Sequence, residues 1–200
     1  GYERGLELLG EGQLRRRLEA LHGYGDVLQL AGRNDDALRA FRELLEHAFR
    51  LDQKSKGGVA HNRIGRLFRS IGHLDEAMRH LGTGQALFVA ADDQRGVASS
   101  IDDIGKVHWL KGSYEPAERF FLRALELRRE LAITATGAAS AELARSIALS
   151  LNNLGLVYQD SGRFEEARRA FEEALHLRQD IGDRPGIAQT LNNLGTIHQD

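Results

Sequence analysis

Residues 151–174 read LNNLGLVYQDSGRFEEARRAFEEA, and this stretch decides the fold because the chain repeats it. The letters LNNLG return at Leu191–Gly195, forty residues later. Degenerate copies occur earlier in the chain, as IDDIG at 101–105, HNRIG at 61–65 and LHGYG at 21–25. The last glycines of the five copies are therefore spaced by 40, 40, 50 and 40 residues. A fixed period of this size is the sequence signature of a solenoid.

Small and large apolar residues recur at the same eight positions of each repeat. In the fourth repeat they are Leu151, Leu154, Gly155, Tyr158, Gly162, Ala167, Phe171 and Ala174. Spacings of 3, 4 and 7 residues place such side chains on one stripe of a helix. A glycine inside a helix costs about 1 kcal/mol relative to alanine. Its recurrence there predicts a partner helix that passes too close for a side chain. Gly32, Gly72, Gly112 and Gly162 fall between paired helices, where a left-handed helix end is expected.

The pattern predicts an all-α chain in which each repeat contributes two helices. The first helices are expected at about 16–31, 57–71, 97–111 and 144–161. The second helices are expected at about 34–51, 74–91, 114–131 and 164–180, and a ninth helix at about 186–199. Residues 1–12 resemble the end of a helix from a preceding repeat. We interpret residues 1–200 as a single array cut from a longer one, with repeats at about 16–55, 56–95, 96–143 and 144–185 and half a repeat at 186–200.

Ten additional residues separate the third and fourth repeats, near residues 132–146. The segment AITATGAASAELARS is rich in Ala, Thr, Ser and Gly, and only Glu142 and Arg145 within it are charged. Loop length adds only slowly to the entropy of closure, so an insertion here is easily tolerated. One interpretation is a surface loop followed by an N-terminal extension of the next helix. The other is a flap over a binding groove, or a docking segment.

The pattern of small and large residues at eight positions of each repeat resembles that of the tetratricopeptide repeat family. The resemblance covers nearly the whole chain. The forty-residue period differs from the usual period of roughly 34 residues. It is similar to the longer-helix subclass found in kinesin light chains, spindle-orientation adaptors and bacterial signalling proteins. The resemblance implies antiparallel helix pairs stacked into a right-handed superhelical solenoid with a concave groove. Members of the family bind peptides or other proteins in that groove and are not themselves catalysts.

The resemblance also places one face of each first helix in the groove. Carried over position by position, the candidate peptide-binding residues are Asn62, Arg63, Arg66, Arg69, Asp102, Asp103, Lys106, Trp109, Asn152, Asn153, Gln159, Asn192 and Asn193. Family members use an asparagine at the position of Asn153 and Asn193 to grip the backbone of an extended peptide. An amide offers both a donor and an acceptor for that purpose. The alternative is that these amides cap carbonyl groups or bridge adjacent repeats.

Arg63, Arg66 and Arg69 lie three residues apart on one face, with no acidic residue among them. Guanidinium groups hold carboxylates and phosphates through paired hydrogen bonds, so this row predicts a partner with an acidic segment. Pairing with Asp102 and Asp103 on the adjacent helix is the competing interpretation.

Two further groove positions bear on the kind of ligand. The family's carboxylate clamp, a Lys followed four residues later by an Asn, is absent because Arg66 and Lys106 occupy the position of that Asn. A ligand with a free C-terminal carboxylate therefore does not follow from the sequence. Trp109, the only tryptophan, is expected either to anchor a partner, as exposed tryptophans commonly do, or to pack under the neighbouring repeat.

The sequence contains no motif for catalysis, cofactor binding or metal binding. GxSxG, HExxH and GxxxxGKS/T are missing, no two of the eight histidines are spaced i,i+4, and there is no cysteine. A net charge of −2 attracts neither nucleic acid nor an anionic membrane. No apolar run reaches the roughly 18 residues that a spanning helix needs. We expect no enzymatic activity, no cofactor, no nucleic-acid or membrane partner, and a cytoplasmic location.

The sequence thus predicts a non-enzymatic scaffold that binds a peptide or protein segment in its groove. One alternative is a regulatory or sensor module of a larger bacterial signalling enzyme or regulator, in which the repeats contact their own catalytic domain. Another is self-association through the open ends of the solenoid, where Leu191, Leu194 and Ile197 lack a second helix to cover them.

Overall fold

The computed structural model describes residues 2–197, with side chains described from residue 12 onward, and every regular element in that range is a helix. The helices are α1 (Tyr2–Leu30), α2 (Asn34–Arg50), α3 (Lys54–Ser70), α4 (Leu74–Ala90), α5 (Gln94–Leu110), α6 (Tyr114–Ile133), α7 (Gly137–Asp160), α8 (Phe164–Asp180) and α9 (Arg184–Ile197). Contacts between Cα atoms divide the chain into two compact units, Gly1–Ser100 and Ile101–Asp200. We refer to them as the N-terminal and C-terminal units.

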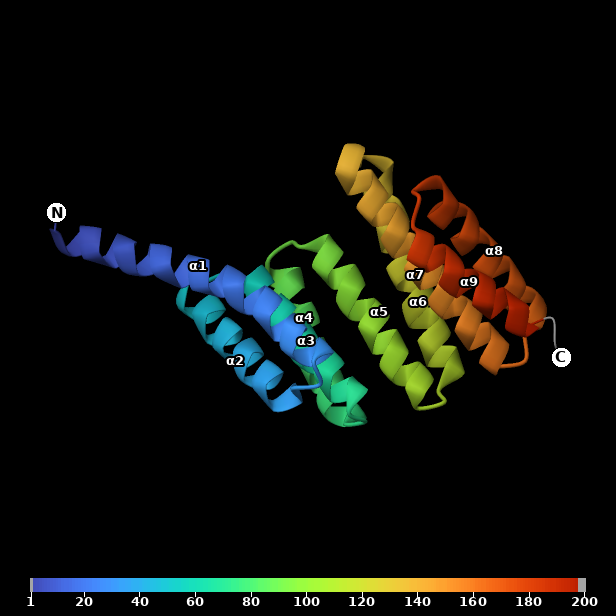
Figure 1. Cartoon of the computed structure of the whole chain (residues 1–200), viewed down its shortest axis with the longest axis horizontal. Helices are drawn as coiled ribbons and strands as arrows, with labels where there is room; N and C mark the ends of the chain where they lie inside the picture. The colour runs from blue at the N-terminus through green and yellow to red at the C-terminus, as the bar shows by residue number, and fades with distance from the viewer. Residues whose placement is uncertain (1, 198–200) are drawn as a thin grey trace. The chain divides into compact units, whose positions relative to one another are not determined.

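Successive helices pack as hairpins joined by short turns (Figure 1). In the N-terminal unit α1 packs on α2, α2 on α3, and α3 on α4. In the C-terminal unit α6 packs on α7, α7 on α8, and α8 on α9. Each unit has its own apolar core, with Phe41 fully buried in one, and Phe121 and Phe171 fully buried in the other. The described residues therefore form an all-α solenoid of helix pairs, which confirms the predicted fold class.

The glycines inside the first helices lie where the paired helices cross, as predicted. A Cβ atom built on Gly65 would lie 2.7 Å from Leu81 Cγ, and one built on Gly105 would lie 2.9 Å from Phe121 Cε1. Real Cβ atoms essentially never come so close to a neighbour. The pairs Gly25–Phe41 and Gly155–Phe171 are closer still. In each repeat the glycine makes room for a large side chain sixteen residues later.

The turns use left-handed backbone at one residue each. Gly32, Gly72, Gly112 and Gly162 have φ values between 71° and 83°, which confirms the predicted helix ends. The turns between repeats use Asp52 (φ 48°), Asp92 (φ 51°) and Gly182 (φ 67°) at the equivalent position. Aspartate tolerates this conformation better than most residues because its short side chain can bond locally. The turn after α3 is closed by the amide of His73, which donates to the carbonyl of Phe68 at 2.9 Å.

The largest difference from the predicted helix ends is at the start of α1. A single helix runs from Tyr2 to Leu30, so residues 2–12, expected to end a preceding helix, continue into the first helix of the first repeat. The reason is local, because the linking residues QLRRRLEA are strong helix formers and contain no proline. Residues 198–200, where the ninth helix was expected to continue to 199, lie outside the described residues.

The ten additional residues near 132–146 mostly extend two helices. α6 continues to Ile133 and α7 begins at Gly137, so only three residues connect them. Leu143, in the added part of α7, is buried with 4% of its surface exposed. The predicted N-terminal extension of the next helix is therefore present.

Candidate functional site

The N-terminal unit contains a cleft with a volume of about 350 Å³, lined mainly by α1, α3 and the first turns of α5. Three arginines, Arg63, Arg66 and Arg95, line it together with His22. Asp93 is the one carboxylate among the described residues of its lining, and it also accepts from the backbone amide of Gly96 at 2.9 Å. Two members of the predicted arginine row thus lie in one cleft, while Arg69 lies half-buried near the end of α3.

Arg63 joins α3 to α1. Its Nη2 atom lies 2.9 Å from Asp26 Oδ2 and 3.3 Å from His22 Nε2. Burial lowers the pKa of His22 and the Arg63 charge lowers it further, although Asp26 opposes both effects. His22 is therefore neutral at pH 7 and can accept a hydrogen bond from the guanidinium group through Nε2.

Arg66 and Asn62 join α3 to α5. Arg66 Nη2 donates to the hydroxyl of Ser99 at 2.9 Å. Asn62 has only 4% of its surface exposed, and its Oδ1 atom accepts from the hydroxyl of Ser100 at 3.0 Å. Arg66 therefore faces the cleft, while Asn62 lies in the wall beneath it.

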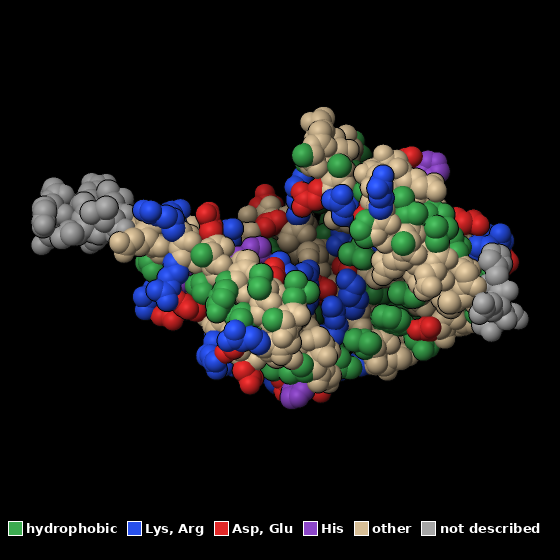
Figure 2. All heavy atoms as spheres, in the orientation of Figure 1, with side chains coloured by type: hydrophobic (Ala, Val, Ile, Leu, Met, Phe, Trp, Pro, Cys, Tyr) green, Lys and Arg blue, Asp and Glu red, His purple; other side chains and the backbone are tan. Residues whose placement is uncertain are grey.

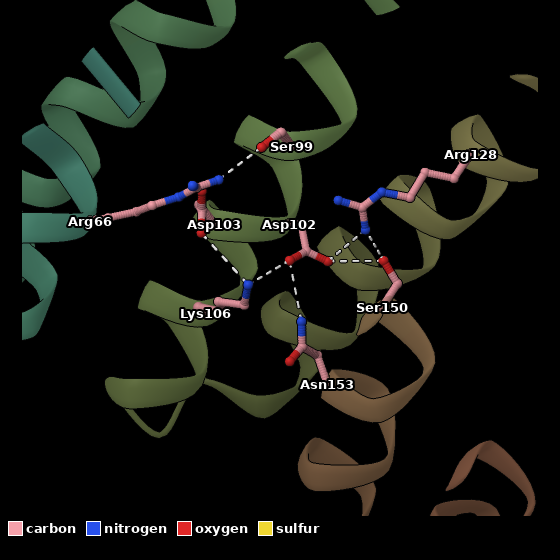
Figure 3. A network of polar contacts seen from close by, with 8 residues as sticks. All are labelled: Arg66, Ser99, Asp102, Asp103, Lys106, Arg128, Ser150 and Asn153. Atoms are coloured by element: carbon pink, nitrogen blue, oxygen red, sulfur yellow. Dashed lines mark hydrogen bonds and ion pairs between the residues drawn. The ribbon is translucent and has the colours of Figure 1, made fainter. Parts of the chain in front are cut away.

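In the C-terminal unit a buried carboxylate binds several side chains of the predicted peptide-binding face. Asp102 on α5 is 2% exposed, and Figure 3 shows four side chains pointing toward its carboxylate. Lys106 Nζ lies 2.8 Å from Oδ2, and Arg128 Nη1 lies 3.0 Å from Oδ1. The hydroxyl of Ser150 donates to Oδ1 at 2.9 Å, and Asn153 Nδ2 donates to Oδ2 at 3.2 Å. The network connects α5, α6 and α7.

The charge on Asp102 is stabilised by its neighbours. Burial alone would raise the pKa of this carboxyl group, but the charges of Lys106 and Arg128 and the hydrogen bond from Ser150 hold it well below its usual range. Asp102 is therefore ionised over the whole physiological pH range. Asp103 is 1% exposed and lies 3.6 Å from the same lysine ammonium, so Lys106 lies between two carboxylates.

The asparagine pairs follow a regular pattern. The first member, Asn152, is 1% exposed, and its Oδ1 atom accepts from Asn193 Nδ2 of the next repeat at 3.0 Å. Asp102, at the equivalent position one repeat earlier, accepts from Asn153 Nδ2 in the same way. Figure 3 shows the Oδ1 atom of Asn153 on the side of the amide away from Asp102. The amides thus bridge adjacent repeats through nitrogen. Asn192 is exposed on α9.

Trp109 and Gln159 lie at the end of the predicted face. The indole Nε1 of Trp109 donates to Asp160 Oδ2 at 2.7 Å, and its ring is partly buried against the apolar core of the C-terminal unit. Gln159 Nε2 donates to the hydroxyl of Thr196 at 3.1 Å, which connects α7 to α9. Trp109 is therefore packed and oriented while part of its surface stays accessible.

Several buried polar residues of these networks were not among the predicted site residues. Ser100, Ser150 and Arg128 make the contacts described above. Arg178 occupies the position of Arg128 one repeat later, is 3% exposed, and donates to Thr190 Oγ1 and the carbonyl of Gly186, each at 2.5 Å. A signal was present in the sequence, because both arginines follow a buried phenylalanine by seven residues on an otherwise apolar stripe.

Other kinds of site are not evident in the described part of the chain. No group of three or more potential metal-binding side chains comes together between residues 12 and 197. No described helix combines the length and apolar character of a membrane-spanning segment. Charged side chains of both signs are spread over the face of the molecule seen in Figure 2.

Comparisons with known proteins agree with this architecture. Family profiles of the tetratricopeptide repeat match residues 18–43, 97–132 and 146–200, which together make up more than half of the chain. No curated protein sequence matches it. Among solved structures, BtubC (BKLC) from P. vanneervenii is similar with a TM-score of 0.72 and 19% identity, over 94% of this chain and 82% of that chain.

A kinesin-light-chain-type protein of Podosopora anserina with nearly identical TPR-like repeats is also similar. Its TM-score is 0.67 at 15% identity, over 92% of this chain and 86% of that chain. At such low identities these similarities show the fold alone, and the fold they show is the helix-pair solenoid described above. The chain therefore belongs to the tetratricopeptide repeat family.

Proposed function

We propose that this protein is a non-enzymatic scaffold that binds an extended peptide or protein segment along the polar face of its first helices. Tetratricopeptide repeats are in general protein-interaction modules. The proposal is carried by the asparagine pattern of the C-terminal unit. Each buried first-position side chain, Asp102 or Asn152, holds the second-position amide of the next repeat, Asn153 or Asn193, in a fixed orientation.

This arrangement suits the recognition of a peptide backbone. Asn153 is 8% exposed, and because its Nδ2 atom donates to Asp102, its Oδ1 atom is the one left to accept a hydrogen bond from a backbone N–H group of a ligand. A side chain that is already ordered loses little entropy when a ligand binds, so preorganisation adds to affinity. We propose that Asn153, Asn193 and Gln159 contact the peptide, while Asn152 and Asp102 hold them from beneath.

Trp109, Lys106 and Asn192 provide other kinds of contact in the C-terminal unit. The indole of Trp109 is held by Asp160 and offers a rigid apolar surface, a type of residue that often dominates binding energy. Lys106, 20% exposed and held between Asp102 and Asp103, offers an ammonium group at the edge of the same face. Asn192 lies exposed on α9.

In the N-terminal unit we propose that the cleft receives an acidic part of the partner. Arg63 and Arg66 line the cleft and Arg69 follows on the same face of α3. Their guanidinium groups already contact other residues of the chain, so an acidic side chain would share or replace those contacts. Asn62 stabilises the wall of the cleft through its hydrogen bond with Ser100.

Selection from a random peptide library displayed on phage, followed by calorimetry with the selected peptides, tests the proposal. The double variant Arg66→Glu/Trp109→Ala removes the indole anchor and reverses the charge of one arginine in the cleft. It should therefore bind the selected peptides at least about tenfold more weakly. Its helicity, measured by circular dichroism, should be unchanged. Arg129→Ala, on the exposed side of α6, is the matched control and should bind normally. Equal affinity of the double variant and the wild type would exclude this surface.

Two other roles remain predictions. A regulatory module of a larger bacterial signalling protein would use the same face against a domain of its own. Self-association would use the apolar side of α9, where Leu191 is 51% exposed. Analytical ultracentrifugation over a wide concentration range tests self-association, and co-purification of this chain with any catalytic domain that its gene also encodes tests the regulatory role.

A further inference from the structure

Two histidines face each other across the α3–α4 hairpin of the N-terminal unit. The Nδ1 atom of His61 lies 3.0 Å from the Nδ1 atom of His80, and the ring centroids are 5.1 Å apart. Both rings are half-buried. At this distance one Nδ1 must carry a hydrogen and donate it, while the other accepts with a lone pair. The contact therefore exists only while at least one of the two Nδ1 atoms is deprotonated.

The other repeats place apolar residues at these two positions. The equivalent pairs are Leu21 with Ala40, Ile101 with Phe120, and Leu151 with Ala170. In those repeats the contact does not depend on pH. Among these four repeats, the second alone has titratable side chains at both of these positions.

The charged groups around the pair are mainly positive. The charges of Arg42 on α2 and Arg79 on α4 both lower the pKa of His80, and Arg79 itself pairs with Glu76 at 3.3 Å. The ring of Phe68 stacks on His80 at 5.5 Å and on a third histidine, His73, at 6.1 Å. Two imidazoles beside two arginines are also a poor site for a metal cation, and no third ligand joins them among the described residues.

We propose that the α3–α4 hairpin is an acid-sensitive element, which opens when His61 and His80 both take up protons. Two protonated imidazoles would direct N–H groups at each other, with Arg42 and Arg79 adding repulsion. Acidification therefore breaks the one polar contact that joins the two rings and leaves charge in a partly buried hairpin.

The pH range follows from the two histidines. Burial, the larger cause, and the electrostatic interaction with His80 together lower the pKa of His61 from 6.5 to about 4. Burial and the two arginines lower the pKa of His80 as well. Between pH 6.5 and 4 the unfolded chain therefore binds more protons than the folded chain, so the free energy of unfolding falls as the pH falls. In the C-terminal unit His108 on α5 responds in the same direction, because burial and the charges of Lys111 and Arg119 lower its pKa. The one histidine of α8, His176, is exposed, so α8 serves as the reference.

A consequence for binding follows if the proposed function holds. α3 carries Asn62, Arg63 and Arg66, which line the cleft. Opening of the hairpin would displace them and release an acidic partner from the N-terminal unit. This consequence rests on the proposed function, whereas the acid sensitivity of the hairpin does not.

Hydrogen exchange measured by mass spectrometry on the whole chain tests the inference without any ligand. We expect protection factors in α3 and α4, corrected for intrinsic exchange, to fall on the order of tenfold between pH 7 and pH 5. Those in α8 should change little. The double variant His61→Leu/His80→Ala, which installs the pair found at Leu151 and Ala170, should abolish this fall. His176→Gln, at an exposed histidine of α8, should behave as the wild type.

Three results would overturn the inference. The first is equal loss of protection in α3–α4 and in α8, because the response would then not be local. The second is an unchanged pH response in the double variant. The third is no fall in protection in the wild type. Thermal unfolding of the double variant at pH 7 checks that it folds, and the single variant His61→Gln offers a second test if it does not.

Discussion

Asp102 occupies a position at which three other repeats carry asparagine, namely Asn62, Asn152 and Asn192. A buried amide needs only hydrogen-bond partners, whereas a buried carboxylate also needs positive charge nearby. Arg128 and Lys106 provide that charge, and the carboxylate in turn orients Asn153. This one departure from the repeat pattern thus places an ionic network between α5, α6 and α7.

Removal of Arg128 should be costly because it leaves a buried carboxylate with only one of its two cationic partners. We expect Arg128→Ala to lower the free energy of unfolding by about 3 kcal/mol or more. The neighbouring Arg129 pairs with Glu173 at the surface, with 52% of its side chain exposed, so Arg129→Ala should cost less than about 1 kcal/mol. Urea denaturation of both variants makes the comparison, and similar losses would mean that the network around Asp102 contributes little stability.

Sequence reasoning identified the faces of the helices but not the contacts between them. A helical wheel shows which residues share a side of one helix, but it did not reveal that Asp102 and Asn152 would be buried. It cannot show which side chain of one repeat reaches the next, because that depends on the distance and rotation between adjacent helices. The contacts Asn153–Asp102 and Trp109–Asp160 span 51 residues each, and only coordinates reveal them.

At the scale of helices and turns, the repeat period allowed most boundaries to be predicted to within a few residues. The glycines carried this information, because each one has a distinct physical reason. Gly65 allows a close crossing and Gly72 allows a left-handed turn. Asp52 and Asp92 escaped notice because aspartate is common outside such turns. The continuity of α1 was missed because residues 1–12 have a helical pattern that fits either a separate helix or an extension.

Two glycines on the same hairpin should respond oppositely to the same substitution. Gly72 has a φ of 83°, where a Cβ atom is strained, so Gly72→Ala should destabilise the protein by about 1 kcal/mol. Gly82 lies inside α4 with open space around it, so Gly82→Ala should stabilise by up to about 1 kcal/mol. Shifts of the thermal midpoint in opposite directions would support this assignment. A stabilising Gly72→Ala would mean that the turn is not left-handed in solution.

For the whole molecule, the central question is whether the two units unfold together. α5 belongs to both of them, since the boundary between Ser100 and Ile101 falls inside this one helix. Helix formation is cooperative, so loosening of residues 101–110 should weaken the hydrogen bonds of residues 94–100. In repeat arrays such coupling passes from each repeat to its neighbour. The array predicted from the sequence should therefore behave as one coupled system.

The variant Asp102→Ala tests this coupling, because it removes the buried carboxylate on which Lys106 and Arg128 converge. We expect hydrogen-exchange protection to fall in residues 101–110, α6 and α7. It should also fall, by about tenfold, in residues 94–100, where Gly96 packs against Phe88 of α4. Arg129→Ala serves as the surface control and should leave both regions protected. If the loss instead stops at Ser100, the units are energetically independent and the single-array interpretation is wrong. A loss that passes Ser100 and declines toward α1 would establish nearest-neighbour coupling, since each helix pair then transmits only part of the perturbation to the next.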